Sequence, residues 1–172
     1  MSGGRALIAP LVAAALLLQG CGYTIGIGGN LPAHVKTVAV PVFVNKTQEP
    51  AIENVITAAV VNAFTSSGCL KVVPVEQADS ILQGSITQYR LDLIAFTAQA
   101  NVTEYRVYVT VDISFRDVKQ DSMLWKQDGL QEQADFRVQG QTSDTIAQQD
   151  QAARVAAVEI GRKIVASAVD RF

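Results

Sequence analysis

One segment of the 172-residue chain constrains the fold more than any other: residues 104–115 alternate polar and apolar side chains without a break. Strict alternation places the two sets on opposite faces of a β-strand, so that one face is buried and the other is polar. At about 3.3 Å per residue such a strand is about 40 Å long, roughly twice the usual length. The apolar set is Tyr105, Val107, Val109, Val111, Ile113 and Phe115. A strand of this length predicts an extended antiparallel sheet with neighbours of similar length.

Several flanking segments supply those neighbours. Residues 81–96 are equally long, and their apolar set changes parity between Ile86 and Tyr89, as a β-bulge requires. They form a predicted long hairpin with residues 104–115. Residues 123–138 follow the turn Gln120-Asp121-Ser122 as a third antiparallel strand. Shorter strands are predicted at residues 35–44, where Pro41 favours a sheet edge or a bulge, and at residues 70–75.

Two other segments have the apolar period of an amphipathic helix. The first opens at Glu49-Pro50 and ends at Ser66-Ser67-Gly68. The second follows Thr142-Ser143-Asp144, whose side chains suit an N-cap, and runs nearly to Phe172. The first stripe is Ile52, Val55, Ile56, Ala59, Val60, Ala63 and Phe64, and the second is Ile146, Ala153, Ala157, Ile160, Ile164 and Ala168.

Three valines widen the apolar arc of the second helix beyond what packing on one sheet requires. They are Val158, Val165 and Val169. One interpretation is that valine is simply tolerated on an exposed helix surface. The other is that these side chains form a second buried contact, with a partner protein.

Together the elements predict an α+β fold: a two-layer sandwich in which two helices pack on a mostly antiparallel sheet of four to five strands with a long central hairpin. Apolar residues make up 49% of the chain and charged residues 17%, a composition that favours a folded core over disorder. The formal net charge of -2 gives no reason to expect nucleic acid as a partner. We expect one domain, over residues 35–172.

The first twenty residues are a predicted signal peptide that is removed from the mature protein. Arg5 precedes 13 uncharged residues rich in Ala and Leu, too few for a helix that spans a membrane. The segment ends Leu18-Gln19-Gly20-Cys21, which is similar to the lipobox of bacterial lipoproteins, although Gln19 departs from the small or β-branched residue usual there. Cys21 is therefore the predicted lipidation site, with palmitate among its acyl chains. The alternative is an ordinary cysteine that follows a short apolar run.

Residues 21–34 are a predicted flexible tether between the lipid and the domain, because residues 22–32 contain four glycines and no charge. Gly22 after the lipidated residue resembles an outer-membrane sorting signal, which predicts an outer-membrane anchor that leaves the domain facing the periplasm. His34 is expected to be a solvated loop residue. Cys69 is expected to be a small buried hydrophobic residue, because its only possible disulfide partner carries the lipid.

The chain shows no constellation that predicts catalysis or a metal centre. His34 is its one histidine, and no His, Cys, Asp or Glu cluster has metal-ligand spacing. There is no Gly-x-Ser-x-Gly elbow and no Gly-rich loop followed by Lys-Ser/Thr. Glu104 and Asp112 share a strand face but lie about 26 Å apart, too far for a carboxylate pair. We therefore expect neither an enzyme nor a bound metal or cofactor.

An ordered set of short segments, spread over nearly the whole mature chain, resembles one protein family. The segments are Cys21-Gly22-Tyr23, Leu31-Pro32, residues 36–43, Asn45-Lys46-Thr47, Pro50 with its helix, residues 78–86, Tyr89, Glu104-Tyr105-Arg106-Val107, Phe115-Arg116-Asp117 and Leu124-Trp125. In this order they are similar to the lipopolysaccharide-assembly lipoprotein of the outer-membrane translocon. The resemblance implies two helices against a four-stranded sheet, seated in the lumen of a large outer-membrane β-barrel.

The resemblance also implies function and sites. Members of the family plug the barrel, help to assemble it, and bind lipopolysaccharide on its way to the cell surface. Arg and Lys bind phosphorylated sugars best, but residues 91–104 at the hairpin tip contain neither, so the candidate contacts are Arg90 and Arg106 at the base of the tip, with Lys126 further away. The candidate barrel contacts are Phe96 in the uncharged tip and the helix valines Val158, Val165 and Val169.

The alternative function is that of a stand-alone periplasmic scaffold or ligand-binding lipoprotein with no barrel partner. Such a protein would have a polar, self-sufficient surface on its second helix. The three valines on that helix argue against it.

Overall fold

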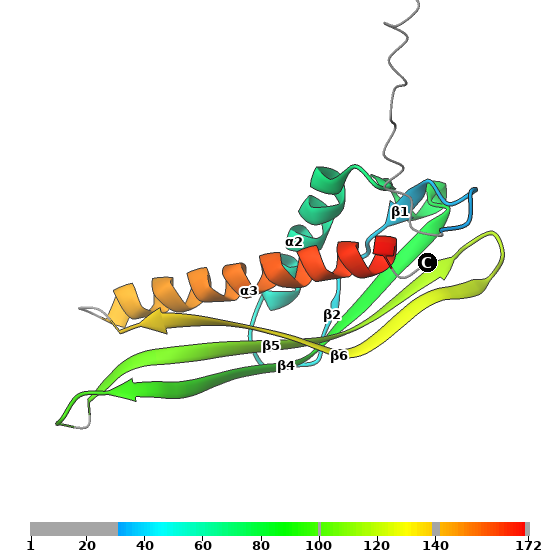
Figure 1. The fold of residues 1–172 in the computed structure, drawn as a ribbon. Helices are drawn as coiled ribbons and strands as arrows, with labels where there is room; N and C mark the ends of the chain where they lie inside the picture. The colour runs from blue at the N-terminus through cyan, green and yellow to red at the C-terminus, as the bar shows by residue number, and fades with distance from the viewer. Residues whose placement is uncertain (1–30, 100, 139–141, 171–172) are drawn as a thin grey trace, which may run out of the picture.

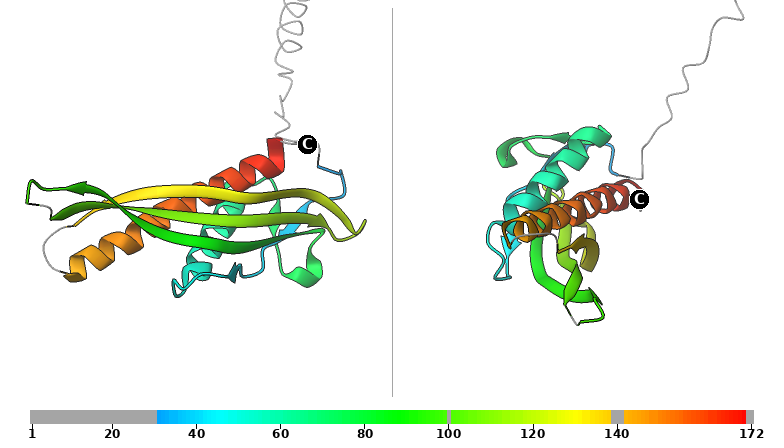
Figure 2. Two further views of the ribbon diagram at one scale, coloured as in Figure 1. Left: turned by 90° about the horizontal axis from the view of Figure 1, so that it is seen from below. Right: turned by 90° about the vertical axis from the view of Figure 1, so that its left-hand side faces the viewer.

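The computed structural model describes residues 31–99, 101–138 and 142–170. Within these ranges the protein has two layers, one mixed sheet and two helices that cover one of its faces (Figures 1 and 2). The strands are β1 (Thr37–Ala39), β2 (Val44–Asn45), β3 (Lys71–Val72), β4 (Ser80–Phe96), β5 (Val102–Asp117) and β6 (Ser122–Arg137). The helices are α2 (Ile52–Ser67) and α3 (Thr142–Asp170), with a short 3-10 helix η1 (Val75–Gln77). The predicted α+β class is confirmed.

Three long antiparallel strands form the body of the sheet. β5 pairs with β4 on one side and with β6 on the other. The register of β4 against β5 shifts between Ile86 and Gln88, which confirms the bulge predicted from the parity change. On β5 the side chains of Val107, Val109, Val111, Ile113 and Phe115 are all buried on the helix side. The alternation that predicted a strand with one buried face therefore describes β5 correctly.

The short strands differ from the predictions. The sheet order is β3-β1-β4-β5-β6 with β2 also paired to β4, so the sheet has six strands rather than four to five. The prediction of one strand over residues 35–44 is wrong, because the chain leaves the sheet after Ala39 and returns at Val44. Pro41 has no N–H to donate, and Phe43 turns into the core, where its ring fills the space beside Gly84 that a Cβ would need.

The segment at residues 70–75 is also shorter than predicted as a strand. Only Lys71–Val72 pairs with β1, in parallel. Pro74, which cannot donate a backbone hydrogen bond, precedes η1 instead. The two-residue β3 therefore marks the outer edge of the sheet beside β1.

Both helices bury the centre of the stripes expected of them, while Val55, Ala59 and Ala63 of the first stripe are half-buried and one residue of the second stripe is exposed. α2 buries Ile52, Ile56, Val60 and Phe64 and ends at Gly68, whose φ of 65° is typical of a helix C-terminus. α3 buries Ala153, Ala157, Ile160, Ile164 and Ala168. Ile146 is 56% exposed, contrary to the predicted stripe, because it lies in the first turns of α3, before the buried part of the helix begins at Ala152. The helices pack on each other closely at Gly161 and Ala59, and α3 lies over β5 and β6.

The molecule is elongated, with distinct ends. The β4–β5 turn lies at one end (left in Figure 1), and the β5–β6 turn lies at the other. The described chain begins near the C-terminal end of α3, also opposite the β4–β5 turn. The hairpin tip thus lies far from the point where residues 31–34 enter the domain.

Candidate functional site

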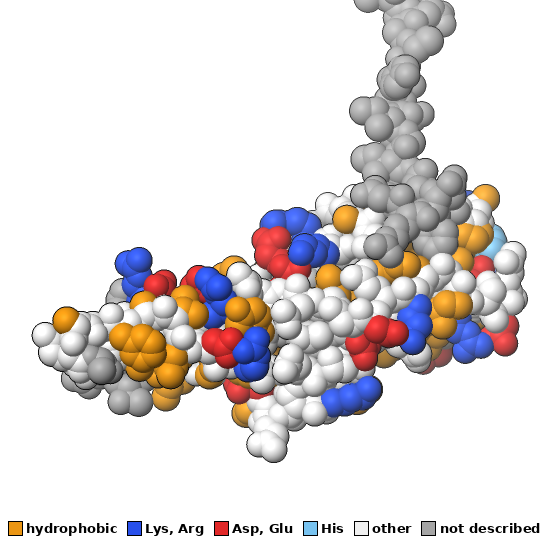
Figure 3. All heavy atoms as spheres, turned by 60° about the horizontal axis from the view of Figure 1, so that its bottom comes forward, with side chains coloured by type: hydrophobic (Ala, Val, Ile, Leu, Met, Phe, Trp, Pro, Cys, Tyr) orange, Lys and Arg blue, Asp and Glu red, His pale blue; other side chains and the backbone are white. Residues whose placement is uncertain are grey.

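The face of the sheet that the helices leave open is polar and rich in ion pairs. It carries the even-numbered side chains of β5 together with the residues paired with them on β4 and β6. Acidic and basic side chains lie next to one another along this face, whereas hydrophobic side chains gather near the hairpin tip (left in Figure 3). The three candidate lipopolysaccharide contacts lie on this open face.

Arg90 and Arg106 are brought close together. Arg106 lies opposite Asp92 on β4 and opposite Asp135 on β6. Its guanidinium donates two hydrogen bonds to Asp135, from Nε to Oδ1 at 2.5 Å and from Nη2 to Oδ2 at 2.7 Å. Arg90 pairs with Asp92, and its guanidinium carbon lies 4.3 Å from the centre of the Tyr108 ring. Two cations thus share a small patch with two carboxylates.

The pairing of Arg106 with Asp135 shifts the pKa of both groups. The hydrogen bonds to Asp135 hold the pKa of Arg106 above its usual range, and the same contact lowers the pKa of Asp135. A phosphate that approaches Arg106 must therefore use the remaining N–H donors of the guanidinium or displace a carboxylate. The patch is a pair of internally balanced cations rather than an open basic site.

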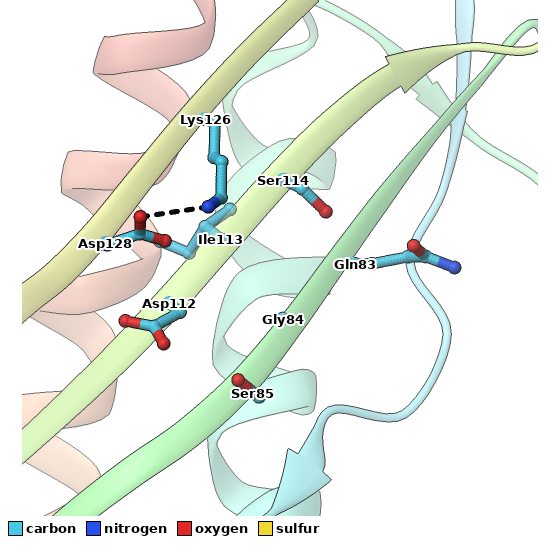
Figure 4. A pocket seen from close by; sticks show the side chains of 8 residues that line it. All are labelled: Gln83, Gly84, Ser85, Asp112, Ile113, Ser114, Lys126 and Asp128. Carbon is cyan, nitrogen blue, oxygen red and sulfur yellow. Dashed lines mark hydrogen bonds and ion pairs between the residues drawn. The ribbon is translucent and has the colours of Figure 1, made fainter. Parts of the chain in front are cut away.

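Lys126 lies apart from the arginines. It is opposite Ser114, eight residues along β5 from Arg106, which is about 26 Å at the usual strand rise. It borders a shallow hollow of about 280 Å³ on the open face, together with Asp112 and Asp128 (Figure 4). Its Nζ donates to Asp128 at 2.9 Å, which raises the pKa of Lys126. The structure does not bring it together with Arg90 and Arg106.

The candidate barrel contacts also divide into two places. Phe96 ends β4 at the hairpin tip and is 56% exposed, as an outward contact requires. Val158 is 49% exposed and Val165 is half-buried, and both line a groove between α2 and α3, of about 320 Å³, with Ala59, Ala63 and Arg162 among its other walls. The side chain of Val169 and the whole of Cys21 lie outside the described residues.

Two polar contacts escaped the sequence analysis. His34, expected to be solvated, has its Nε2 2.6 Å from Oδ2 of Asp117, a fully buried residue 83 positions away. Asp79 accepts hydrogen bonds from the backbone amides of Lys36 and Thr37 at 3.1 Å each, and pairs with Lys119 at 2.7 Å. Both contacts tie the start of the domain to distant parts of the sheet. No sequence signal joins residues so far apart.

Other features bear on chemistry. Cys69 is a free, half-buried cysteine, so the prediction of a buried residue is wrong. It follows Gly68, the residue that caps the C-terminus of α2. Among the described residues, no group of three or more His, Cys, Asp or Glu side chains could hold a metal ion. None of the helices in the described ranges has the length and hydrophobicity needed to span a membrane.

Comparison with known proteins gives one family. The LptE model, described as lipopolysaccharide-assembly, matches residues 35–168, nearly the whole described domain. A search of the curated proteins found no match.

Solved structures share the fold at low sequence identity. A protein from Xanthomonas campestris matches with a TM-score of 0.55 and 12% identity, covering 83% of this chain and 90% of its own. A hypothetical protein from Chlamydia trachomatis matches with a TM-score of 0.53 and 10% identity, covering 77% and 94%. Lipoprotein B from Nitrosomonas europaea matches with a TM-score of 0.50 and 14% identity, covering 79% and 84%. At these identities the likeness concerns the fold alone.

Proposed function

We propose that this chain, which belongs to the LptE family of lipopolysaccharide-assembly proteins, plugs and helps to assemble a large outer-membrane β-barrel translocon and binds lipopolysaccharide during its delivery to the outer leaflet. The observation that carries the proposal is the family match over residues 35–168. The chain acts by binding rather than by turnover. Its lipid anchor is Cys21, and its domain faces the periplasm and the barrel lumen.

The open face of the sheet supports a place inside a barrel. The lumen of a large transmembrane barrel is polar, and this face presents ion pairs such as Arg106–Asp135 and Lys126–Asp128. Because each pair is balanced internally, the face can lie against a wet, polar wall without leaving an unpaired charge. The apolar contacts would then be made elsewhere, by Phe96 at the tip and by Val158, Val165 and Val169 on α3.

The lipid half of the proposal rests on Arg90 and Arg106. They lie on one patch and present N–H donors beyond those that their carboxylate partners use. A phosphorylated sugar would bind across both guanidinium groups through these remaining donors, with the bonds to Asp92 and Asp135 kept. Lys126 is a separate contact, because it lies about 26 Å away along the sheet.

The barrel half is tested by mild-detergent extraction of the full-length lipidated chain, followed by identification and quantification of what co-purifies. We expect one large outer-membrane β-barrel protein in fixed stoichiometry with the chain. Recovery of the chain alone, from membranes in which its domain is folded, would favour the stand-alone scaffold. Cys21→Ser should leave an unprocessed precursor in the same preparation, because the lipidated residue would be missing.

The lipid half is tested by lipopolysaccharide binding to the purified domain. Arg90→Gln and Arg106→Gln should each weaken binding roughly tenfold, about 1.4 kcal/mol, and the loss should shrink as ionic strength rises. Glutamine is preferred to glutamate at position 106, since a carboxylate there would face both Asp92 and Asp135. The matched control is Arg116→Gln, a paired arginine at the other end of the same face. Equal affinity for all three variants and the wild type would remove the lipid half of the proposal.

A further inference from the structure

Half of β4 forms a free edge of the sheet. β4 pairs with β1 at Ser80 and Ile81 and with β2 at Ser85 and Ile86. Beyond the bulge, no strand in the described part of the chain pairs with the side of β4 that faces away from β5. Residues 88–96 therefore have a neighbour on one side only, along about 30 Å of strand.

The direction of the backbone groups on this edge follows from one hydrogen bond. The carbonyl of Thr103 on β5 accepts from the amide of Val138 at 3.0 Å, so the backbone groups of Thr103 point toward β6. Because these directions alternate along a strand, Arg106, Tyr108 and Thr110 point toward β4. The residues paired with them on β4 are Asp92, Arg90 and Gln88, whose backbone groups point toward β5. The alternate residues of β4, Tyr89, Leu91 and Leu93, therefore direct their N–H and C=O groups away from β5, at the free edge.

The side chains of Tyr89, Leu91 and Leu93 face the helix side of the sheet, where α3 covers them only in part. α3 packs over β5 and β6 and meets β4 through the bond from Gln149 to the Tyr89 hydroxyl, at 3.2 Å. Further along, Leu91 is 39% exposed and Leu93 is 50% exposed. This stretch thus combines unpaired backbone groups with apolar side chains at every second position.

The opposite edge of the sheet is protected in a way that this one is not. On β6 the register shift against β5 brings Gly129 into a positive φ of 68°, and its amide donates to Asp112 at 2.8 Å. Lys126 and Asp128 flank that irregularity. Such bulges and charges prevent another strand from pairing with an edge. From Gln88 to Leu93, β4 pairs with β5 without a register shift, and its two charged residues, Arg90 and Asp92, carry their side chains on the open face. Register shifts follow between Leu93 and Ala95 and between Ala95 and Phe96, so the regular part of this edge ends at Leu93.

We propose that residues 88–93 of β4 bind an extended segment of the partner barrel protein as an additional strand. The segment carries apolar side chains at alternate positions, which cover Leu91 and Leu93 and extend the helix-side face of the sheet. The occupant is a polypeptide strand because only a backbone supplies donors and acceptors at the two-residue repeat of this edge. The inference rests on the proposed function, since it names the part of the chain that binds the barrel.

Amide hydrogen exchange, resolved to single residues by mass spectrometry, tests the proposal on the wild-type protein. It compares the lipidated full-length chain alone with the same chain bound to the β-barrel protein that it extracts with. We expect the amides of Leu91 and Leu93 to exchange fast in the free chain and to be protected at least about tenfold in the complex. The amides of Arg90 and Asp92, which point toward β5, should be protected in both. Unchanged exchange at Leu91 and Leu93 within an intact complex would overturn the inference and leave the proposed function standing.

A pair of variants separates the backbone contact from the side-chain contact. Leu91→Pro and Leu91→Ala both remove the leucine side chain, but only proline removes the outward N–H, at a position where an edge strand tolerates it. We expect Leu91→Pro to recover roughly three- to tenfold less barrel than Leu91→Ala, with Arg90 and Asp92 still protected. Equal recovery would overturn the strand addition. A second result would also overturn the strand addition: an amide of Leu91 that becomes better protected in the free chain as the protein concentration rises. That result would favour pairing between two copies of the chain.

Discussion

Two carboxylates organise the beginning of the domain at the scale of single residues. Asp117 is fully buried, and its Oδ1 accepts the backbone amides of Lys119 and Gln120 at 2.8 and 3.0 Å while its Oδ2 meets His34. Burial acts to raise the pKa of Asp117, but these hydrogen bonds outweigh it and the pKa is lowered. A buried carboxylate with this set of partners fixes the β5–β6 turn and the segment before β1 relative to each other.

Asp79 makes folding sensitive to acid. Its hydrogen bond to Lys119, then those from Lys36 and Thr37, hold its pKa well below the ordinary value of 3.8. A lowered folded-state pKa stabilises the fold above the ordinary value, and this contribution is lost as the pH falls below it. We expect Asp79→Asn to lower the free energy of unfolding at pH 7, with a difference from the wild type that shrinks toward pH 2. Urea unfolding measures this, with Glu76→Gln, an exposed neighbour, as the control; a difference that stays constant with pH would contradict the assignment.

At this scale the sequence predicts little of what the structure contains. Arg90, Arg106 and Lys126 follow from residue type and resemblance. Arg90 and Lys126 pair with carboxylates two residues along their own strands, whereas the partner of Arg106, Asp135, lies on the neighbouring strand. The pairing of Arg106 with Asp135 can be identified only once the register of β5 against β6 is known. The His34–Asp117 contact is harder still, because it joins residues 83 positions apart.

At the scale of secondary-structure elements, the contact between Phe43 and Gly84 decides how the N-terminal strands meet β4. The Phe43 ring occupies the position that a Cβ on Gly84 would take, and Phe43 is 2% exposed. We expect Gly84→Ala to reduce the free energy of unfolding by about 1–3 kcal/mol, since the ring must move within a packed core. Chemical denaturation measures the loss, with Ser85→Ala as the adjacent control. A Gly84→Ala protein as stable as the wild type would mean that the ring is free to move.

The contact between Phe43 and Gly84 also shows why the long strands could be predicted from the sequence and the short N-terminal strands could not. Period-two alternation needs no knowledge of the rest of the fold, so β4, β5 and their bulge follow from the sequence. Residues 35–44 show the same valine-rich pattern, yet they divide into β1 and β2. Two features separate β1 from β2: the missing N–H of Pro41, and the contact of Phe43 with Gly84, about forty residues away. The contact with Gly84 cannot be predicted from the local sequence pattern.

At the scale of the whole molecule, the two halves of the proposed function use different faces. Arg90 and Arg106 lie on the open face of the sheet, whereas the groove of Val158 and Val165 lies between the helices on the other side. Phe96 projects at one end, far from the entry of the chain at residues 31–34 (Figure 1). A protein seated in a barrel would contact its surroundings on the open face, in the helix groove and at the hairpin tip. The wide separation of these three surfaces is consistent with such a position.

The central claim is that this domain binds a barrel through its hairpin tip, and the most direct measurement is the amount of β-barrel protein that co-purifies per full-length chain. Phe96→Asp places an unpaired carboxylate at the tip, at a cost of several kcal/mol if that contact is dry. The control is Met123→Asp, at the opposite end of the sheet, where the methionine is 55% exposed against 56% for Phe96. We predict at least roughly tenfold less barrel with Phe96→Asp and an unchanged amount with Met123→Asp. Equal recovery of the barrel by the wild type and Phe96→Asp would contradict the claim.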